Sequence, residues 1–159
     1  MAFQSVWYYT DIPEEVVDLI EKDLTETFDP QMGDSRLMGD ALNKDKRNSK
    51  NAWVPTNHWL GGFMWHYISR ANRENFLYDL RCIDGESMQY TQYDVGQFYS
   101  WHNDAGIAGA YKPATVGNRT EGLAQDFVNE NTELVRKLSF VLQLSDPDDY
   151  EGGNLQMLD

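Results

Sequence analysis

The part of the chain that decides the fold is YDVGQFYSWHND, residues 93–104. Side chains alternate in character over residues 88–93, a turn is indicated at residues 94–96, and residues 97–102 follow as a second extended run. Two such runs on either side of a glycine-bearing turn are typical of a β-hairpin. The sequence therefore predicts two extended strands here, the second of which leads into His102.

His102 and Asp104 stand two positions apart at the end of this stretch. Residues i and i+2 of a strand project to the same side, so the imidazole and the carboxylate can converge on one ion. One nitrogen and one carboxylate oxygen suit Fe(II) in a two-histidine, one-carboxylate site. The other reading of the pair is two polar residues at a strand end. His58 and His66 are eight apart, roughly 12 Å of helical rise, which is too far to share a metal.

Two helices are predicted before this stretch. The first begins near Pro13, after the capping side chain of Asp11, because residues 16, 17, 20 and 24 are apolar at helical spacing. The second begins near Thr56 or Asn57 and carries a wide apolar stripe that is expected to pack against a sheet. The stripe has one row at Trp59, Phe63, Tyr67 and Ala71 and a second row beside it at Leu60, Met64 and Ile68. Between the helices, residues 28–51 are polar and are predicted to be a loop with a short strand.

After residue 104 the pattern changes twice. Residues 106–131 are polar and contain glycines, which predicts either a mobile lid or a long connection, with a short helix near residues 123–128. Residues 138–144 alternate with a period of two and predict a strand, which an acidic turn ending in Gly152 and Gly153 closes. A further strand is predicted to begin at Asn154.

Composition bounds the class of protein. A chain of 159 residues with 41% hydrophobic residues is expected to form one domain over residues 1–159. The 26 acidic and 13 basic residues give a net charge of -13, which argues against nucleic acid and anionic lipid as partners. Cys82 is the single cysteine, and the sequence has neither a signal-peptide pattern nor an apolar run of membrane-spanning length. A cytoplasmic location is the expectation, and the oligomeric state is left open.

Two blocks carry a family resemblance. Residues 93–104 resemble the Tyr-x-x-Gly-x-x-Tyr-x-x-His-x-Asp block of prolyl 4-hydroxylases and related bacterial and viral 2-oxoglutarate oxygenases, and the spacing matches at every named position. A second block, RKLSFVLQLS at residues 136–145 followed by EGGNL at residues 151–155, resembles the later strand pair of the same family.

The resemblance implies an α+β fold. Its core would be a double-stranded β-helix, a jelly roll buttressed by the N-terminal helices and lacking its last strands. By the same resemblance, His102 and Asp104 would be iron ligands and Tyr93 would hydrogen-bond the carboxylate of 2-oxoglutarate. Gln143 and Leu155 match positions that line the same cosubstrate pocket.

The implied activity is that of a dioxygenase. Fe(II) and 2-oxoglutarate, with ascorbate as a further cofactor, would support hydroxylation of a C–H bond with release of succinate and carbon dioxide. A prolyl residue of a peptide or protein is the expected target, while a free amino acid or another side chain stays open. The alternative is a non-catalytic aromatic-rich β-domain that binds a protein or carbohydrate, with His102 and Asp104 as ordinary polar residues.

The chain departs from the family pattern in its last part. The family continues to a distal histidine, the third iron ligand, and then to an Arg or Lys that pairs with the far carboxylate of 2-oxoglutarate. No histidine follows His102 here. We therefore expect a fragment of a longer product, with strands supplied by a partner or a shortened inactive relative as alternatives. Residues 1–159 alone are expected to be a weak or inactive catalyst.

Overall fold

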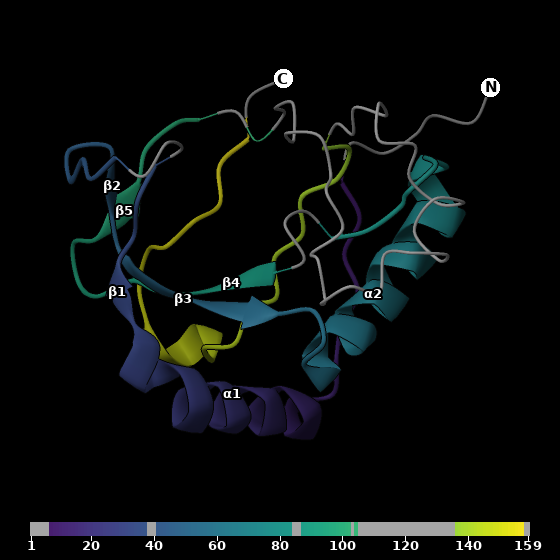
Figure 1. Ribbon diagram of the computed structural model, residues 1–159, viewed down its shortest axis with the longest axis horizontal. Helices are drawn as coiled ribbons and strands as arrows, with labels where there is room; N and C mark the ends of the chain where they lie inside the picture. The colour runs from purple at the N-terminus through teal and green to yellow at the C-terminus, as the bar shows by residue number, and fades with distance from the viewer. Residues whose placement is uncertain (1–6, 38–40, 84–86, 103, 105–135, 158–159) are drawn as a thin grey trace, which may run out of the picture. The chain divides into compact units, whose positions relative to one another are not determined.

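The computed structural model describes residues 7–37, 41–83, 87–102, 104 and 136–157, which form a mixed α+β structure (Figure 1). The elements in chain order are α1 (Glu14–Phe28), β1 (Gly33–Asp34), β2 (Arg47–Asn48), β3 (Lys50–Pro55), α2 (Trp59–Ala71), β4 (Ser87–Gln92) and β5 (Phe98–Tyr99). Short helical turns follow α1 at Asp29–Gln31 and α2 at Asn72–Phe76, and a third lies at Pro147–Asp149. The α+β class predicted from the sequence is confirmed.

The described strands form two small sheets. β1, β3 and β4 make a three-stranded sheet in that order, and β2 and β5 make a two-stranded sheet. β1 runs antiparallel to β3, with Gly33 opposite Asn51, and β2 runs antiparallel to β5, with Arg47 opposite Tyr99. In Figure 1, β3 and β4 are the two long arrows that lie side by side.

The chain divides into two compact units built from interleaved segments. One unit comprises residues 1–10, 53–88 and 102–140, and therefore contains α2. The other comprises residues 11–52, 89–101 and 141–159, and contains α1, β1, β2 and β5.

Helix α1 follows its predicted period. Ile20, Leu24 and Phe28 are buried at intervals of four, which places them on one face of the helix. The cap differs from the prediction, because Pro13 occupies the N-cap position and its side chain makes no capping bond. The proline side chain has no atom that can accept a hydrogen bond from the first helical amides, and Glu14 and Glu15 supply the negative charge that favours a helix N-terminus instead.

Helix α2 buries one row of the wide apolar stripe that the sequence predicts. Leu60, Gly61 and Met64 are buried, whereas Trp59 is 50% exposed. The rings at positions 59, 63 and 67 contact one another in succession along the helix, with centroids 6.2 and 5.0 Å apart. The predicted stripe is therefore buried in part, and the aromatic row that begins at Trp59 is not its most buried side. The aliphatic row beside it is the face that the fold buries.

β3 and β4 show the alternation of half-buried strands. Ala52 and Val54 are buried around the exposed Trp53, and Met88 and Tyr90 are buried around the exposed Gln89. Residues two apart in a strand share a face, so each strand contributes one apolar side to the core. The strand predicted at residues 88–92 is confirmed.

The predicted β-hairpin is wrong in its pairing. β5 covers only Phe98 and Tyr99 and pairs with β2, while β4 belongs to the sheet of β3. A turn separates them, in which the Gln97 amide donates to the Asp94 carbonyl over 2.9 Å and Gly96 has a φ of +76°. The left-handed residue redirects the chain, and the sequence pattern alone cannot show which earlier strand the second run meets.

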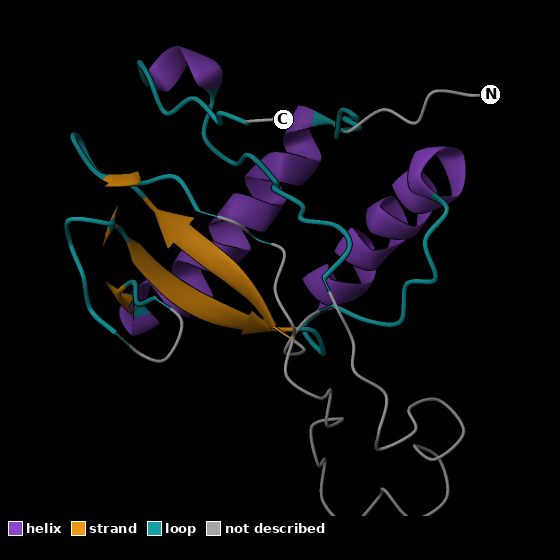
Figure 2. Cartoon of the chain, turned by 90° about the horizontal axis from the view of Figure 1, so that it is seen from above, coloured by secondary structure: helices purple, strands orange, loops and turns teal. Residues whose placement is uncertain are grey.

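Residues 138–144 do not form the predicted strand. The described chain from residue 136 to 157 contains no strand, and only the turn at Pro147–Asp149 is helical (Figure 2). An alternating pattern gives a preference for extended backbone, but a strand also needs a neighbour to complete its hydrogen-bond ladder. The strand predicted from Asn154 is absent from residues 154–157 for the same reason.

Two other expectations are limited by the part of the chain that is described. The lid and short helix predicted within residues 106–131 lie outside the described residues. Among the helices that are described, none combines the length and apolar character needed to cross a membrane.

Candidate functional site

His102 and Asp104 lie in direct contact. His102 Nε2 is 3.1 Å from Asp104 Oδ1, and the two side chains are 37% and 54% exposed. Neither residue is in a strand, since β5 ends at Tyr99, so the strand geometry used to predict their meeting is wrong. The two side chains that the sequence singled out are nevertheless brought together, with a nitrogen facing a carboxylate oxygen.

The second oxygen of Asp104 is held by Ser139. The Ser139 hydroxyl donates to Asp104 Oδ2 over 2.8 Å, although 35 residues separate the two in the chain. Sequence reasoning missed this contact, because Ser139 read only as one position of an alternating strand. The available signal was its place in the second resembling block, but a pattern within that block gives no distance to Asp104.

The three side chains are not arranged as a hydrolytic triad. In such a triad the serine contacts the histidine, which removes its proton, and the carboxylate orients the histidine from the other side. Here Asp104 is the central group and Ser139 contacts the carboxylate instead. The arrangement therefore gives no activated serine.

The side chains of His102 and Asp104 fit metal binding better than they fit a hydrolytic triad, because of the types of donor atom that they offer. Two donors about 2.1 Å from one ion and 90° apart lie about 3.0 Å from each other, and the observed nitrogen-to-oxygen distance is 3.1 Å. The same distance suits a direct hydrogen bond between imidazole and carboxylate. The donor types, imidazole and carboxylate, are two of the three in an Fe(II) facial triad.

The other two histidines belong to α2 or cap it. His58 is the N-cap residue of α2, where its Nδ1 accepts from the Leu60 amide over 3.4 Å, and His66 meets the Tyr67 ring edge-on with centroids 5.4 Å apart. Within the described ranges, no group of three His, Cys, Asp or Glu side chains is placed to hold a metal ion.

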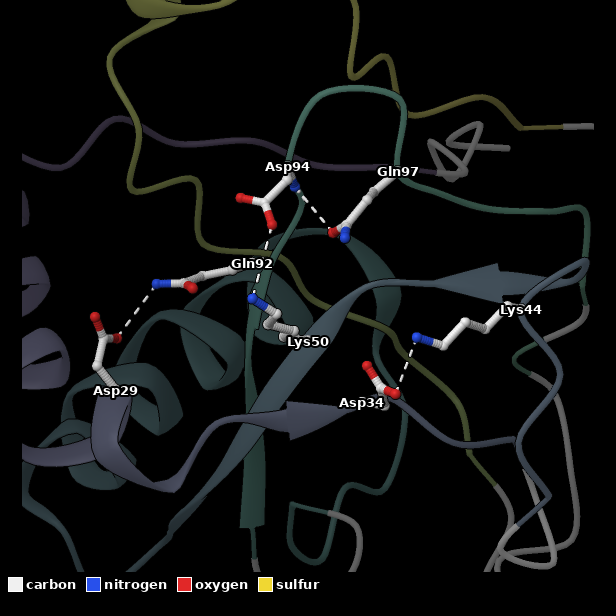
Figure 3. Close-up of polar contacts among 7 residues, drawn as sticks. All are labelled: Asp29, Asp34, Lys44, Lys50, Gln92, Asp94 and Gln97. Carbon is white, nitrogen blue, oxygen red and sulfur yellow. Dashed lines mark hydrogen bonds and ion pairs between the residues drawn. The ribbon is translucent and has the colours of Figure 1, made fainter.

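Tyr93 lies just after β4 and is 50% exposed. Its neighbours on both sides are tethered within the same unit, as Figure 3 shows. Gln92 Nε2 donates to Asp29 Oδ1 over 3.2 Å, and the Asp94 amide donates to Gln97 Oε1 over 2.9 Å. Both sequence neighbours of Tyr93 therefore make hydrogen bonds, while Tyr93 itself is half-exposed.

Gln143 and Leu155 lie outside regular secondary structure. Gln143 is exposed, and Leu155 keeps 76% of its surface exposed. Neither is enclosed by the described part of the chain, so the structure does not place them as pocket-lining residues. The predicted site residues divide between the two units, with His102 and Asp104 in one and Tyr93, Gln143 and Leu155 in the other.

A separate ionisable cluster lies at the end of α2. Glu74 accepts from the Tyr8 hydroxyl over 2.5 Å and from Arg70 Nε over 2.9 Å. The hydrogen bond from Tyr8, and after it that from Arg70, lowers the pKa of Glu74, while the same bond raises the pKa of Tyr8. All three groups are exposed, which is typical of a surface network that ties the N-terminal segment to α2.

Comparison of the chain with protein-family models, with curated proteins and with solved structures found no match in any of the three.

Proposed function

We propose that the chain contributes the metal-binding core of an Fe(II)- and 2-oxoglutarate-dependent dioxygenase that hydroxylates a C–H bond, with a prolyl residue of a peptide or protein as the substrate. The observation that carries the proposal is the contact of His102 Nε2 with Asp104 Oδ1 at 3.1 Å, within the sequence spacing of the resembled family. This donor pair fits two of the three protein positions of an Fe(II) site.

In the proposed reaction, iron and 2-oxoglutarate supply the chemistry that activates oxygen, with succinate and carbon dioxide as coproducts. The chain's own residues bind and orient. His102 would offer a ring nitrogen and Asp104 a carboxylate oxygen to the metal, and the remaining positions would be left to other ligands. By the family resemblance, Tyr93 would donate its phenol hydrogen to a carboxylate of the cosubstrate. The pocket-lining roles of Gln143 and Leu155 rest on the resemblance alone, since both side chains are exposed.

The proposed fold around this site is the double-stranded β-helix, with α1 and α2 as its supporting helices. The mixed α+β class and the small antiparallel sheets are compatible with this finer architecture.

The experiment is an anaerobic titration of the Fe(II)-loaded protein with 2-oxoglutarate. Chelation of Fe(II) by the cosubstrate gives a visible charge-transfer absorption, which reports binding without turnover. We expect the absorption in the wild type and its loss in His102→Ala and in Asp104→Ala. His66→Ala is the matched control, because His66 is an exposed histidine of α2 outside the pair. An equal absorption in wild type and His102→Ala would refute the proposal.

The cosubstrate role of Tyr93 has its own test in the same titration. Loss of a hydrogen bond to a charged group costs about 1.5 kcal/mol or more, so Tyr93→Phe should raise the dissociation constant of 2-oxoglutarate about 10-fold. Tyr9→Phe is the control, since Tyr9 is 74% exposed and lies outside the proposed site. An unchanged constant in Tyr93→Phe would remove Tyr93 from the site without removing the metal pair.

The alternative function, protein or carbohydrate binding without chemistry, has one observation in its favour. Four of the five tryptophans, at positions 7, 53, 59 and 101, are between 50% and 59% exposed. Exposed indole rings are effective contact surfaces for partners and ligands. Saturable quenching of tryptophan fluorescence by an oligosaccharide, together with no charge-transfer absorption, would favour this function.

A further inference from the structure

Each carboxylate oxygen of Asp104 contacts another side chain. His102 Nε2 faces Oδ1 at 3.1 Å and the Ser139 hydroxyl donates to Oδ2 at 2.8 Å. The terminal torsion of an aspartate side chain is intrinsically broad. A half-exposed Asp104 would therefore sample many orientations of its carboxylate plane if only one oxygen were engaged. Two contacts on opposite oxygens fix that plane.

The segment that carries Ser139 is itself anchored within the same unit. Two residues earlier, the Lys137 ammonium lies 5.7 Å from the centre of the Tyr78 ring. Tyr78 is in turn held on the end of α2, because Asn72 Nδ2 donates to its carbonyl and Asn72 Oδ1 accepts from its amide, each over 2.8 Å. Ser139 therefore reaches Asp104 from a stretch tied to a helix, despite the absence of a strand ladder.

We infer that Ser139 is a positioning residue for the metal site, an inference that rests on the proposed function. Its hydroxyl occupies Oδ2, so Asp104 presents only Oδ1 to the ion that it shares with His102. A carboxylate that bound through both oxygens would use a coordination position needed by cosubstrate or oxygen. Partners of this kind around metal ligands typically contribute about 10- to 100-fold to metal affinity.

The test compares two substitutions of nearly equal size. Ser139→Thr keeps the hydroxyl, whereas Ser139→Val replaces it with a methyl group, so the pair separates hydrogen bonding from packing. The probe is Mn(II), a redox-stable substitute for Fe(II), and the dissociation constant is measured from the electron paramagnetic resonance signal of free Mn(II). His102→Ala reports whether the site is the one proposed, and Ser145→Ala serves as an exposed serine control. Circular dichroism shows that each variant is folded.

We expect Ser139→Val to weaken Mn(II) binding at least about 10-fold and Ser139→Thr to stay within about threefold of the wild type. Equal affinities of the Thr and Val variants would overturn the positioning role, whether both are tight or both are weak. If His102→Ala binds as tightly as the wild type, the proposed metal site itself fails. A loss in His102→Ala with no difference between Thr and Val would leave the site standing and remove Ser139 from it.

Discussion

Replacing Gly61 by alanine should destabilise the protein, and replacing its neighbour Gly62 should stabilise it. Both glycines lie in the first turns of α2. A Cβ at Gly61 would overlap the Thr56 carbonyl oxygen and lie 2.8 Å from the Thr56 C and Cα atoms, whereas a Cβ at Gly62 would meet nothing within 4 Å. The close approach arises because the His58 amide donates to the Pro55 carbonyl and the Gly61 amide to the His58 carbonyl, each over 2.9 Å.

The magnitude follows from two opposing effects. Alanine gains about 1 kcal/mol over glycine in a helix interior. At Gly61 the obstacle is backbone, so α2 or the preceding turn must shift by about 1 Å to reach an ordinary carbon contact. Overpacking of this kind costs about 1–3 kcal/mol, and the upper end applies because no side chain can rotate away. The net expectation is a loss of about 2 kcal/mol for Gly61→Ala and a gain of about 0.5–1 kcal/mol for Gly62→Ala.

Equilibrium unfolding in urea measures both variants. With a slope of about 2 kcal/mol per molar, Gly61→Ala should lower the midpoint by about 1 M, with the slope itself unchanged. The two variants differ by one position and carry the same new methyl group, so each controls for the other. A Gly61→Ala midpoint equal to or above that of Gly62→Ala would refute the close packing of α2 on the Thr56 turn.

The core and the ion network give three more expectations. Ile20→Ala, at a fully buried position of α1, should lower the free energy of unfolding by about 2–5 kcal/mol, while Leu19→Ala, 64% exposed, should change it by less than about 0.5 kcal/mol; similar losses would contradict the assigned buried face. Arg47→Ala should lower the free energy of unfolding in urea by about 2–4 kcal/mol. Arg47 is 6% exposed, and its guanidinium donates to the Ser49 and Gln89 side chains, which would both lose this hydrogen bond; a loss below about 1 kcal/mol would contradict this role. For Glu74, the pKa is lowered by its bonds from Tyr8 and Arg70, so its stabilising contribution is present above about pH 4.3 and is lost as the pH falls through the lowered pKa. The wild-type midpoint should therefore fall more steeply with acid than that of Glu74→Gln, and parallel slopes would show that the network does not stabilise the fold.

The sequence predicts local structure well for an element that has a single apolar face, because that face is buried wherever the element packs. The period of four at Ile20, Leu24 and Phe28 specifies one face of α1 wherever that helix packs, and the alternation of Met88 and Tyr90 specifies the buried side of β4. These features depend on spacing alone. In α2 two apolar rows run side by side, so spacing leaves open whether the row of Trp59 or the row of Leu60 is buried, and the fold buries the second.

Long-range pairing is where prediction from the sequence fails. Phe98 and Tyr99 are recognisable as extended residues, but their partner is β2, some fifty residues earlier, and not the adjacent β4. The guanidinium of Arg47 lies 4.6 Å from the centre of the Tyr99 ring, a contact that spans the same interval. Extended residues compete for many possible neighbours, and only the whole fold selects one.

For the candidate site, prediction from the sequence succeeds for some residues and fails for others. His102 and Asp104 were identified from donor type and spacing, and they do meet, although in irregular backbone and not in a strand. Ser139 was overlooked because a serine in an alternating run has no distinguishing chemistry until Asp104 is found beside it. The positions of Gln143 and Leu155 were taken from the family resemblance alone, and the structure leaves both exposed.

The most direct measurement of the central claim is anomalous X-ray diffraction from crystals grown without oxygen in the presence of Mn(II) and 2-oxoglutarate. The account predicts an anomalous peak about 2.1–2.2 Å from His102 Nε2 and from one oxygen of Asp104, with the cosubstrate on the same ion. The account would be contradicted if, at a saturating concentration of Mn(II), His102 and Asp104 stay in direct contact and no anomalous peak lies between them.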